Sequence, residues 1–229
     1  LFCKAIDNVG ESFIEISIDY FQAGFLEEAI SLLSFIENKT LDPMVNYYLG
    51  YYHQLSGNHS AAPFSYKKAQ DVEPEYCFPN RLEDILVLED AIKVGAAFSS
   101  KAHYYLGNLW YDKRQYRQAI HHWEESAKLN PDFPTVHRNL AIAYFNKNKD
   151  SAMALKSLEK AFELDHTDSR VLYELDQLYK KLNRSPQERL LLLEKYLDLV
   201  SQRDDLSLEF ITLLNLCNKM ELALAILRN

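Results

Sequence analysis

Residues 106–131, LGNLWYDKRQYRQAIHHWEESAKLNP, decide the fold, because residues 49–74, LGYYHQLSGNHSAAPFSYKKAQDVEP, repeat their spacing. Both stretches open with Leu-Gly, place Ala 12 residues after Gly, and place Pro 12 residues after that Ala. Small residues at such points let two antiparallel helices approach closely, and Pro stops the second helix before the next one begins. The spacing therefore predicts repeated pairs of helices.

The same offsets resemble the tetratricopeptide pattern of roughly 34 residues, with its Leu-Gly, large aromatic, Ala and Pro positions. This resemblance covers nearly the whole chain. It implies an all-α fold, a right-handed superhelical solenoid of antiparallel helix pairs that works as an interaction scaffold. The apolar residues recur at three- and four-residue spacings and the chain has only 6 Gly and 7 Pro, which also favours helices.

Extending the register predicts six repeats and one interruption. The repeats fall at about 10–42, 43–76, 100–133, 134–168, 169–203 and 204–229, the last one partial. Residues 77–99 are too few for a pair and carry one apolar stripe, which predicts a single extra helix at about 79–95. A lone helix reverses the up-down alternation, so we expect the array to change direction there.

Two repeats depart from the pattern. The fourth needs one extra residue, which we expect in the inter-helix turn near Lys149 and Asp150. In the fifth, Asp176 and Arg189 replace small residues of the pattern. The last predicted helix is apolar, and no polar capping helix follows it. We therefore expect this chain to be a segment of a longer array and to self-associate through this end.

The charge distribution and the cysteine content indicate which partners and which cellular compartment to expect. Residues 1–99 carry 15 acidic and 6 basic groups, and the rest of the chain carries 18 and 19, so no half has the positive field of a nucleic-acid binder. The most apolar run, residues 190–193, is far too short to span a bilayer. The three cysteines are odd in number and widely separated, which indicates a reducing, cytoplasmic setting. We expect neither a nucleic-acid nor a membrane partner.

A narrower resemblance rests on several short stretches. They are Cys77-Phe78-Pro79, Arg81-Leu82-Glu83, Tyr104-Tyr105-Leu106-Gly107-Asn108-Leu109, His137-Arg138-Asn139-Leu140, Glu174-Leu175-Asp176-Gln177-Leu178 and Arg203-Asp204-Asp205-Leu206. Together they resemble the repeat region of a bacterial family of unknown function. In that family the repeats follow a domain similar to the galactose-mutarotase β-sandwich, which implies carbohydrate-related work by a larger parent protein.

The candidate binding residues follow from the tetratricopeptide resemblance, in which certain positions of each first helix face a concave groove. Those positions make a tyrosine-rich set with amide and guanidinium donors: Tyr47, Tyr51, Tyr104, Asn108, Tyr111, Arg138, Tyr173 and Gln177. The alternative is ordinary packing of aromatic residues between repeats, because Tyr often buries its ring and leaves its hydroxyl in water.

Chaperone-binding members of the family hold a peptide's terminal carboxylate with a clamp of Lys, Asn, Asn, Lys and Arg. Asn108, Asn139 and Arg170 resemble three of these residues. Tyr104 and Glu174 stand where the clamp has two cations. The lost charge-assisted bonds argue against a chaperone-tail receptor.

The sequence gives little support for a metal site or a catalytic site. His121, His122 and Glu125 lie within about one helical turn, but no further ligand has matching spacing, so we favour a solvated polar face. No serine elbow, Cys-His signature or phosphate loop is present in the sequence, and adjacent carboxylates diverge on a helix. We therefore expect no catalytic site, no metal and no cofactor.

The leading hypothesis is a non-enzymatic protein-interaction scaffold, part of a larger bacterial protein, which binds a partner segment or a neighbouring domain of its parent chain. The alternative is a carbohydrate-binding or substrate-shaping part of a multidomain carbohydrate-active enzyme.

Overall fold

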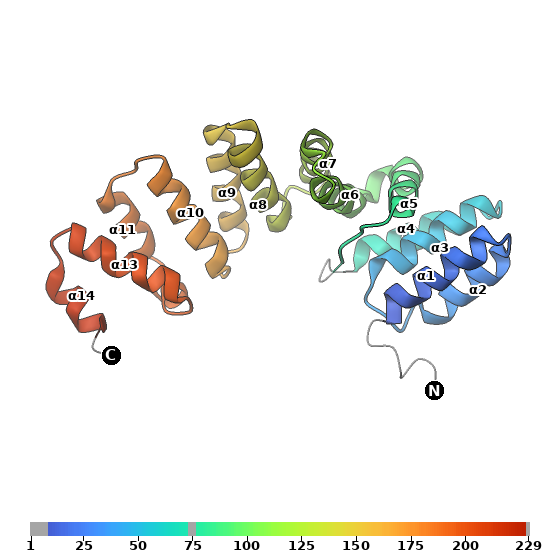
Figure 1. The fold of residues 1–229 in the computed structure, drawn as a ribbon, viewed down its shortest axis with the longest axis horizontal. Helices are drawn as coiled ribbons and strands as arrows, with labels where there is room; N and C mark the ends of the chain where they lie inside the picture. Colours follow the sequence, from blue (N-terminus) through green and yellow to red (C-terminus); the bar gives the residue numbers. More distant parts are fainter. Residues whose placement is uncertain (1–8, 73–76, 228–229) are drawn as a thin grey trace. The chain divides into compact units, whose positions relative to one another are not determined.

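The computed structural model describes residues 9–72 and 77–227, and all regular structure in these ranges is helical. The all-α class and the antiparallel helix pairs expected from the sequence are confirmed (Figure 1). Pro74, Cys3 and the ends of the predicted repeats 43–76 and 204–229 lie outside the described residues. The chain divides into two compact units, residues 1–131 and 132–229.

Unit 1 holds three helix pairs and one single helix. Its elements are α1 (Val9–Gln22), α2 (Leu26–Ile36), α3 (Pro43–Leu55), α4 (Ala62–Asp71), α5 (Leu82–Val94), the short η2 (Ala96–Phe98), α6 (Ser100–Asp112) and α7 (Tyr116–Leu129). The pairs are α1 with α2, α3 with α4, and α6 with α7. They fall in the predicted repeats 10–42, 43–76 and 100–133, except that α1 begins one residue earlier, at Val9.

Among the described residues, unit 2 holds three helix pairs, of which the first two are irregular. Its elements are α8 (Pro134–Ala143), the π-helical turn η3 (Tyr144–Asn148), α9 (Ser151–Leu164), α10 (Ser169–Lys181), α11 (Pro186–Glu194), α12 (Leu197–Val200), α13 (Asp204–Leu216) and α14 (Met220–Leu227). The helix that follows α10 is broken after Glu194, so it forms α11 and α12. The exact repeat boundaries stay a prediction, because helices do not mark where one repeat ends.

Close contact within the pairs depends on the small residues of the repeated pattern. A Cβ built on Gly107 would overlap the ring of Trp123, and one on Gly50 would overlap the ring of Tyr66. Ala119 is completely buried at the same crossing of α6 and α7. The Leu-Gly and Ala positions therefore act as the sequence predicts, letting one helix lie against an aromatic side chain of the other.

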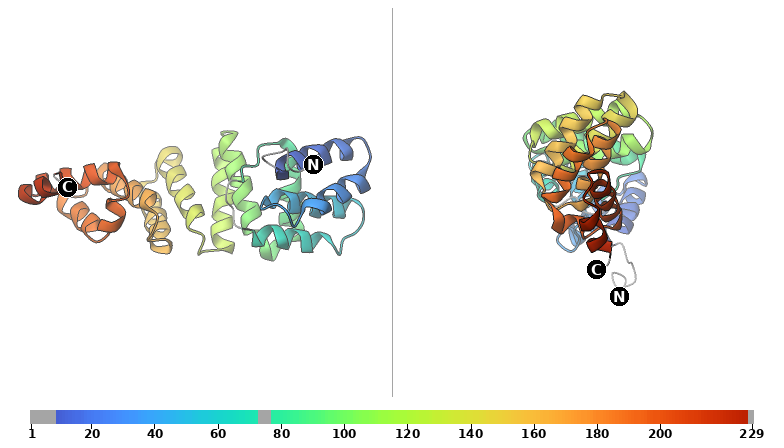
Figure 2. Two further views of the ribbon diagram at one scale, coloured as in Figure 1. Left: turned by 90° about the horizontal axis from the view of Figure 1, so that it is seen from below. Right: turned by 90° about the vertical axis from the view of Figure 1, so that its left-hand side faces the viewer.

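The single helix α5 packs against both α3 and α6. The Tyr48 hydroxyl of α3 donates to Asp84 Oδ1 of α5 at 2.7 Å, and Tyr66 of α4 donates to Asp90. In Figure 1 the α6–α7 pair runs nearly along the line of sight, whereas α1–α4 lie across it, and the turned view in Figure 2 shows the same difference. Within unit 1 the array thus changes direction at α5, as expected for a helix without a partner.

The extra residue of the fourth repeat lies within the helix and not in the turn alone. It is accommodated as the π-helical turn η3, which is followed by Lys149 with a left-handed φ of 58°. This corrects the expectation of a longer inter-helix turn. A π turn adds one residue without lengthening the connection, so the geometry between α8 and α9 is preserved.

Candidate functional site

Tyr47 and Tyr104 are buried in unit 1, which corrects their assignment to an open groove. Tyr47 is 1% exposed and packs edge-on against Tyr105, with 6.0 Å between ring centroids. Its hydroxyl has no hydrogen-bond partner among the described residues, and burial raises the pKa of Tyr47. The cause is that α6 and Cys77 cover the face of α3 which would line a groove in a regular array.

Tyr51 and Tyr111 are half-buried and lie against other aromatic rings. Tyr51 meets Phe21 edge-on at 6.5 Å, and burial raises its pKa. The centroid of the Tyr111 ring lies 5.3 Å from that of Trp123 and 5.1 Å from that of Tyr116. Each ring therefore contributes to packing within unit 1.

Asn108 holds the Trp123 side chain in place. Its Oδ1 accepts a hydrogen bond from Trp123 Nε1 at 3.1 Å, and the same indole N–H lies 3.3 Å from the Tyr104 carbonyl. Asn108 thus has a structural role at the α6–α7 interface, in addition to any contact with a ligand.

Arg138, Tyr173 and Gln177 lie in unit 2 and have partners within it. Arg138 Nε donates to Glu174 Oε2 at 2.8 Å, and its Nη2 donates to the other carboxylate oxygen. The Arg203 guanidinium lies 5.7 Å from the centre of the Tyr173 ring. Gln177 Nε2 donates to Asp176 Oδ2 at 3.2 Å. The eight predicted groove residues divide between the units, five in unit 1 and three in unit 2.

A cavity of about 170 Å³ opens between α8 and α10, the first helices of the first two pairs in unit 2. The residues that line it are Ala141, Ile142, Phe145, Asn146, Leu158, Tyr173, Glu174, Gln177, Leu178 and Lys181. We call this space the α8–α10 pocket. Two predicted residues, Tyr173 and Gln177, belong to it, and Arg138 reaches it through its ion pair with Glu174.

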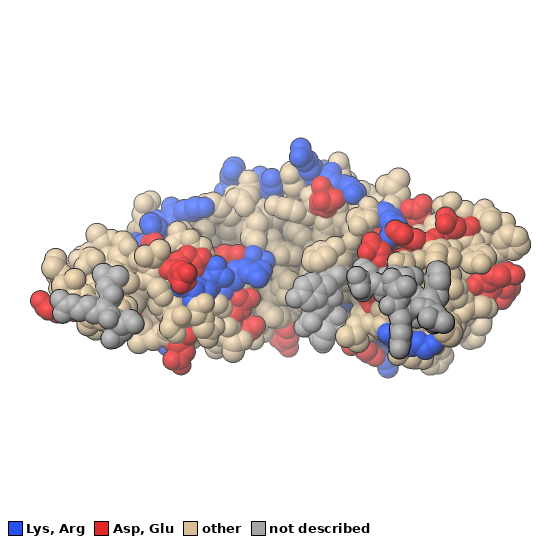
Figure 3. Space-filling model, turned by 60° about the horizontal axis from the view of Figure 1, so that its bottom comes forward, with Lys and Arg blue, Asp and Glu red and all other residues tan. Residues whose placement is uncertain are grey.

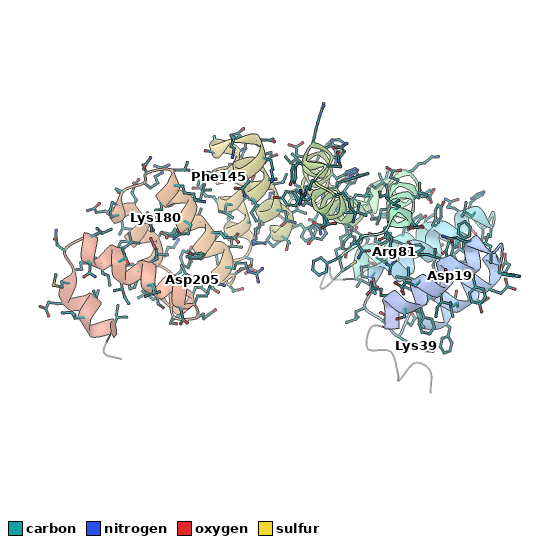
Figure 4. All side chains as sticks on the ribbon, viewed as in Figure 1. Asp19, Lys39, Arg81, Phe145, Lys180 and Asp205 are labelled. Atoms are coloured by element: carbon teal, nitrogen blue, oxygen red, sulfur yellow. The ribbon has the colours of Figure 1, made fainter. Side chains whose placement is uncertain are left out.

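The α8–α10 pocket has an apolar floor and one available cation. Ala141, Leu158 and Leu178 are buried beneath it. Lys181 Nζ lies 5.0 Å from the centre of the Phe145 ring (Phe145 is labelled in Figure 4), and among the described residues no carboxylate forms an ion pair with Lys181. Glu174, in contrast, is already neutralised by Arg138.

Phe145, Asn146 and Lys181 were missed from the sequence. Phe145 and Asn146 belong to η3, and nothing in a single sequence indicates that an inserted residue will form a π turn. Lys181 is one helical turn beyond Gln177, so the spacing of four residues was the available clue.

Asp84 is a buried carboxylate of unit 1 with a structural role. Asp84 accepts from the backbone N–H groups of Asn80 and Arg81, both at 2.9 Å, and so caps α5.

Across the described ranges, no group of three or more His, Cys, Asp or Glu side chains is close enough to hold a metal ion. Among these residues no helix is both long and apolar enough to cross a membrane. On the face in Figure 3, basic and acidic side chains adjoin in several places.

Comparison with known proteins identifies the repeat type in part of the chain. Residues 107–148 match the family model described as TPR repeat, the tetratricopeptide repeat. This match includes Gly107 and Trp123, whose packing is described above, and the α8 helix. The chain therefore contains tetratricopeptide-type repeats.

Three solved structures are similar to this chain. PilF of Pseudomonas aeruginosa has 19% identity and a TM-score of 0.49, with 94% of this chain and 87% of that chain covered. TTC0263, a TPR protein of Thermus thermophilus, has 20% identity and a TM-score of 0.40, with 90% and 98% covered. MamA of Desulfovibrio magneticus RS-1 has 16% identity and a TM-score of 0.40, with 87% and 98% covered. At these identities the likeness concerns the fold alone.

Proposed function

We propose, from the tetratricopeptide-type repeats that this chain contains, that it is a non-catalytic interaction scaffold whose α8–α10 pocket binds a segment of a partner protein. The observation that carries this proposal is the pocket itself: an apolar floor between two first helices, with polar side chains at its rim. Binding sites of this kind are concave and mostly apolar, with a few polar groups that fix orientation.

The volume and the floor favour one aliphatic side chain as the anchor. About 170 Å³ is well below the roughly 300 Å³ at which drug-sized ligand pockets begin, and it suits a single Leu, Ile or Met side chain. Burying such a side chain contributes about 1.5–3 kcal/mol. The partner segment thus inserts one aliphatic residue between α8 and α10.

The charge at the rim favours an acidic neighbour for that anchor. Lys181 has the Phe145 ring beneath it and no carboxylate partner among the described residues, so an incoming Asp, Glu or terminal carboxylate completes its interactions. Because Arg138 already holds Glu174, a cationic residue of the partner gains nothing at this end of the pocket.

A peptide fits this pocket better than a sugar. Sugar rings stack on open aromatic faces, and the Arg203 guanidinium already lies over Tyr173 while Lys181 lies over Phe145.

The resemblance to a bacterial family with a mutarotase-like domain keeps a neighbouring domain of a larger parent protein as one source of the segment. The described cysteines, Cys77 and Cys217, are free, which supports a cytoplasmic setting.

A displayed random-peptide library, selected on the purified chain, tests this function. We expect enriched sequences with an aliphatic residue followed closely by Asp or Glu. Gln177→Phe, which fills the pocket from its rim, should weaken such peptides by about 1–3 kcal/mol, as for an anchor residue. Enrichment of sequences that bind Gln177→Phe as tightly as wild type would overturn the proposal.

A charge reversal provides the matched control. Lys181→Glu should weaken the acidic peptides and favour the same peptides with Lys in place of the acid. Lys156→Glu makes the same change on the exposed face of α9, outside the pocket, and should leave both affinities unchanged.

A further inference from the structure

His103 and His122 point their ring nitrogens at each other across the α6–α7 pair of unit 1. The two Nδ1 atoms are 3.0 Å apart, and the ring centroids are 5.2 Å apart with the ring planes at 41°. In a neutral pair of this kind, one Nδ1–H donates and the other Nδ1 accepts. Both rings are therefore oriented by the packing of α6 against α7, nitrogen to nitrogen.

This pairing supplies the ligand that the sequence lacked. His121, His122 and Glu125 lie on one helix without a further ligand at matching spacing, and α6 brings His103 to His122 from a position 19 residues earlier. Glu125 follows His122 by three residues, so the two share a face of α7. Burial lowers the pKa of both paired histidines, and the Glu125 charge partly opposes this lowering, which places the carboxylate near the pair.

The environment keeps both rings in the form that binds metal ions. Burial lowers the pKa of His122 to about 4, helped by His103 and His121, and burial also lowers the pKa of His103. At neutral pH the rings are uncharged, and metal ligation requires neutral imidazole. His122 is only half-buried, so an ion has access from solvent.

The separation of the nitrogens is close to what a metal ion needs. Zn–N bonds of about 2.05 Å at a tetrahedral angle put two ligand nitrogens about 3.3 Å apart. The observed 3.0 Å is shorter than this, so both rings rotate to open the gap and to turn their lone pairs from the N···N line toward the ion. An ion at this point replaces one hydrogen bond.

We propose that His103 and His122 form an open binding site for a divalent transition-metal ion such as Zn²⁺, with both Nδ1 atoms as ligands. Water completes the coordination, and the Glu125 carboxylate, which pairs with Lys128 at 3.3 Å, becomes a further donor after a change of rotamer. Since the described residues hold no group of three ready ligands, the site is weaker than a closed structural zinc site. Imidazole ligands favour Zn²⁺, Ni²⁺ and Cu²⁺ over Mg²⁺ and Ca²⁺.

Calorimetric titration of the untagged, chelator-treated chain with ZnCl₂ tests the site. We expect one equivalent of Zn²⁺ to bind with a micromolar Kd, and MgCl₂ not to compete. His103→Gln and His122→Gln should each weaken binding at least tenfold. His121→Gln removes the exposed neighbouring imidazole and should change the Kd less than threefold, which makes it the matched control.

Two further measurements keep the result interpretable. Melting curves of the metal-free variants show whether each one folds, and long-range ¹H–¹⁵N spectra of the wild type show which ring nitrogens shift on Zn²⁺ addition. Shifts at Nδ1 of His103 and His122 support the site. No binding, equal binding by the two pair variants and wild type, or loss of binding in His121→Gln alone would overturn the proposal and leave the pair a structural hydrogen bond.

Discussion

The α6–α7 pair and the α10–α11 pair hold two helices together by different chemistry at equivalent positions of the repeat. In α6–α7, Gly107 leaves room for the Trp123 ring, and Ala119 is completely buried. In α10–α11, Asp176 replaces the glycine and Arg189 replaces the alanine, and both are buried. In α6–α7 the helices approach closely because the residues at their crossing are small. In α10–α11 two charged side chains fill the crossing.

The buried charges of the second pair form a connected network. Arg189 donates to Asp176 through Nε at 2.9 Å and through Nη2 at 2.6 Å, and its Nη2 also reaches Glu209 of α13 at 2.7 Å. Lys180 donates to Glu209 at 2.6 Å. Burial raises the pKa of Asp176 even against the opposing effect of Arg189, so the charged form is held at an energetic cost.

The difference shows that helix-pair geometry does not require the small residues of the repeated pattern. A buried ion pair can occupy the same crossing, provided that every charge has its partner. The network also ties α13 to α10 and α11, which compensates for the break between α11 and α12. We infer that the fifth pair depends on its electrostatics where the third depends on packing.

Removing one charge should have the largest effect. Asp176→Ala leaves Arg189 buried with only Glu209 as a partner, and should lower the free energy of unfolding by about 3–5 kcal/mol. Replacing both residues by apolar ones of similar size, Asp176→Leu with Arg189→Met, should recover most of this loss. Denaturant unfolding curves measure both.

The exposed ion pair Lys160–Glu163 is the control for that experiment. Lys160→Ala should change stability by about 0.5 kcal/mol or less, because exposed ion pairs contribute little. If Asp176→Ala costs no more than Lys160→Ala, the buried network does not hold the fifth pair together.

Adding one methyl group to the packed pair should have the next largest effect. Gly107→Ala places a Cβ against the Trp123 ring, and overpacking should cost about 1–3 kcal/mol in thermal unfolding. The double variant Gly107→Ala with Trp123→Leu should lose less stability than the two single variants lose together, because leucine leaves room for the added methyl group. Strict additivity would show that Trp123 does not close this interface.

Removing the Asn108 amide should have a smaller effect on stability. Trp123 Nε1 loses its acceptor at 3.1 Å but keeps the Tyr104 carbonyl at 3.3 Å, so Asn108→Ala should cost about 0.5–1.5 kcal/mol. Affinity for the peptides selected on the α8–α10 pocket should not change. Weaker peptide binding without any loss of melting temperature would instead assign Asn108 to a ligand.

The turns that end the first helices should give the smallest effect, with the opposite sign. Arg114 follows α6 with φ of 60°, and Asn183 follows α10 with φ of 56°. Arg114→Gly should stabilise the chain by about 0.5–1 kcal/mol, because glycine adopts this left-handed conformation without strain. Asn183→Gly should gain less, since asparagine tolerates it better. Thermal melts that rank the two the other way contradict this account.

Local spacing was enough to predict the helix pairs, the single helix and some turns. Gly24 and Gly57 lie in inter-helix turns with positive φ of 88° and 81°, a conformation that glycine adopts readily. The corresponding turns at Arg114, Lys149 and Asn183 carry no glycine, so the sequence did not mark their left-handed residues. Spacing identifies where helices cross, because crossings require small residues at fixed intervals.

The candidate site was less predictable because it depends on which faces become covered. Tyr47 occupies a groove position in the pattern, but the interruption by α5 brings Tyr105 and Cys77 over it. The π turn at η3 and the His103–His122 contact arise from packing between helices. Arg189 appeared as a defect of the repeat until its partners in α10 and α13 were known.

The most direct test of the proposed function is a ¹H–¹⁵N correlation spectrum of the chain titrated with a library-selected peptide. The account predicts that the largest shifts fall on the backbone amides of Ile142, Phe145, Gln177 and Lys181, which line the α8–α10 pocket, and that Gln177→Phe abolishes them. Shifts confined to other helices, or unchanged shifts in Gln177→Phe, would contradict the claim that this pocket binds the partner segment.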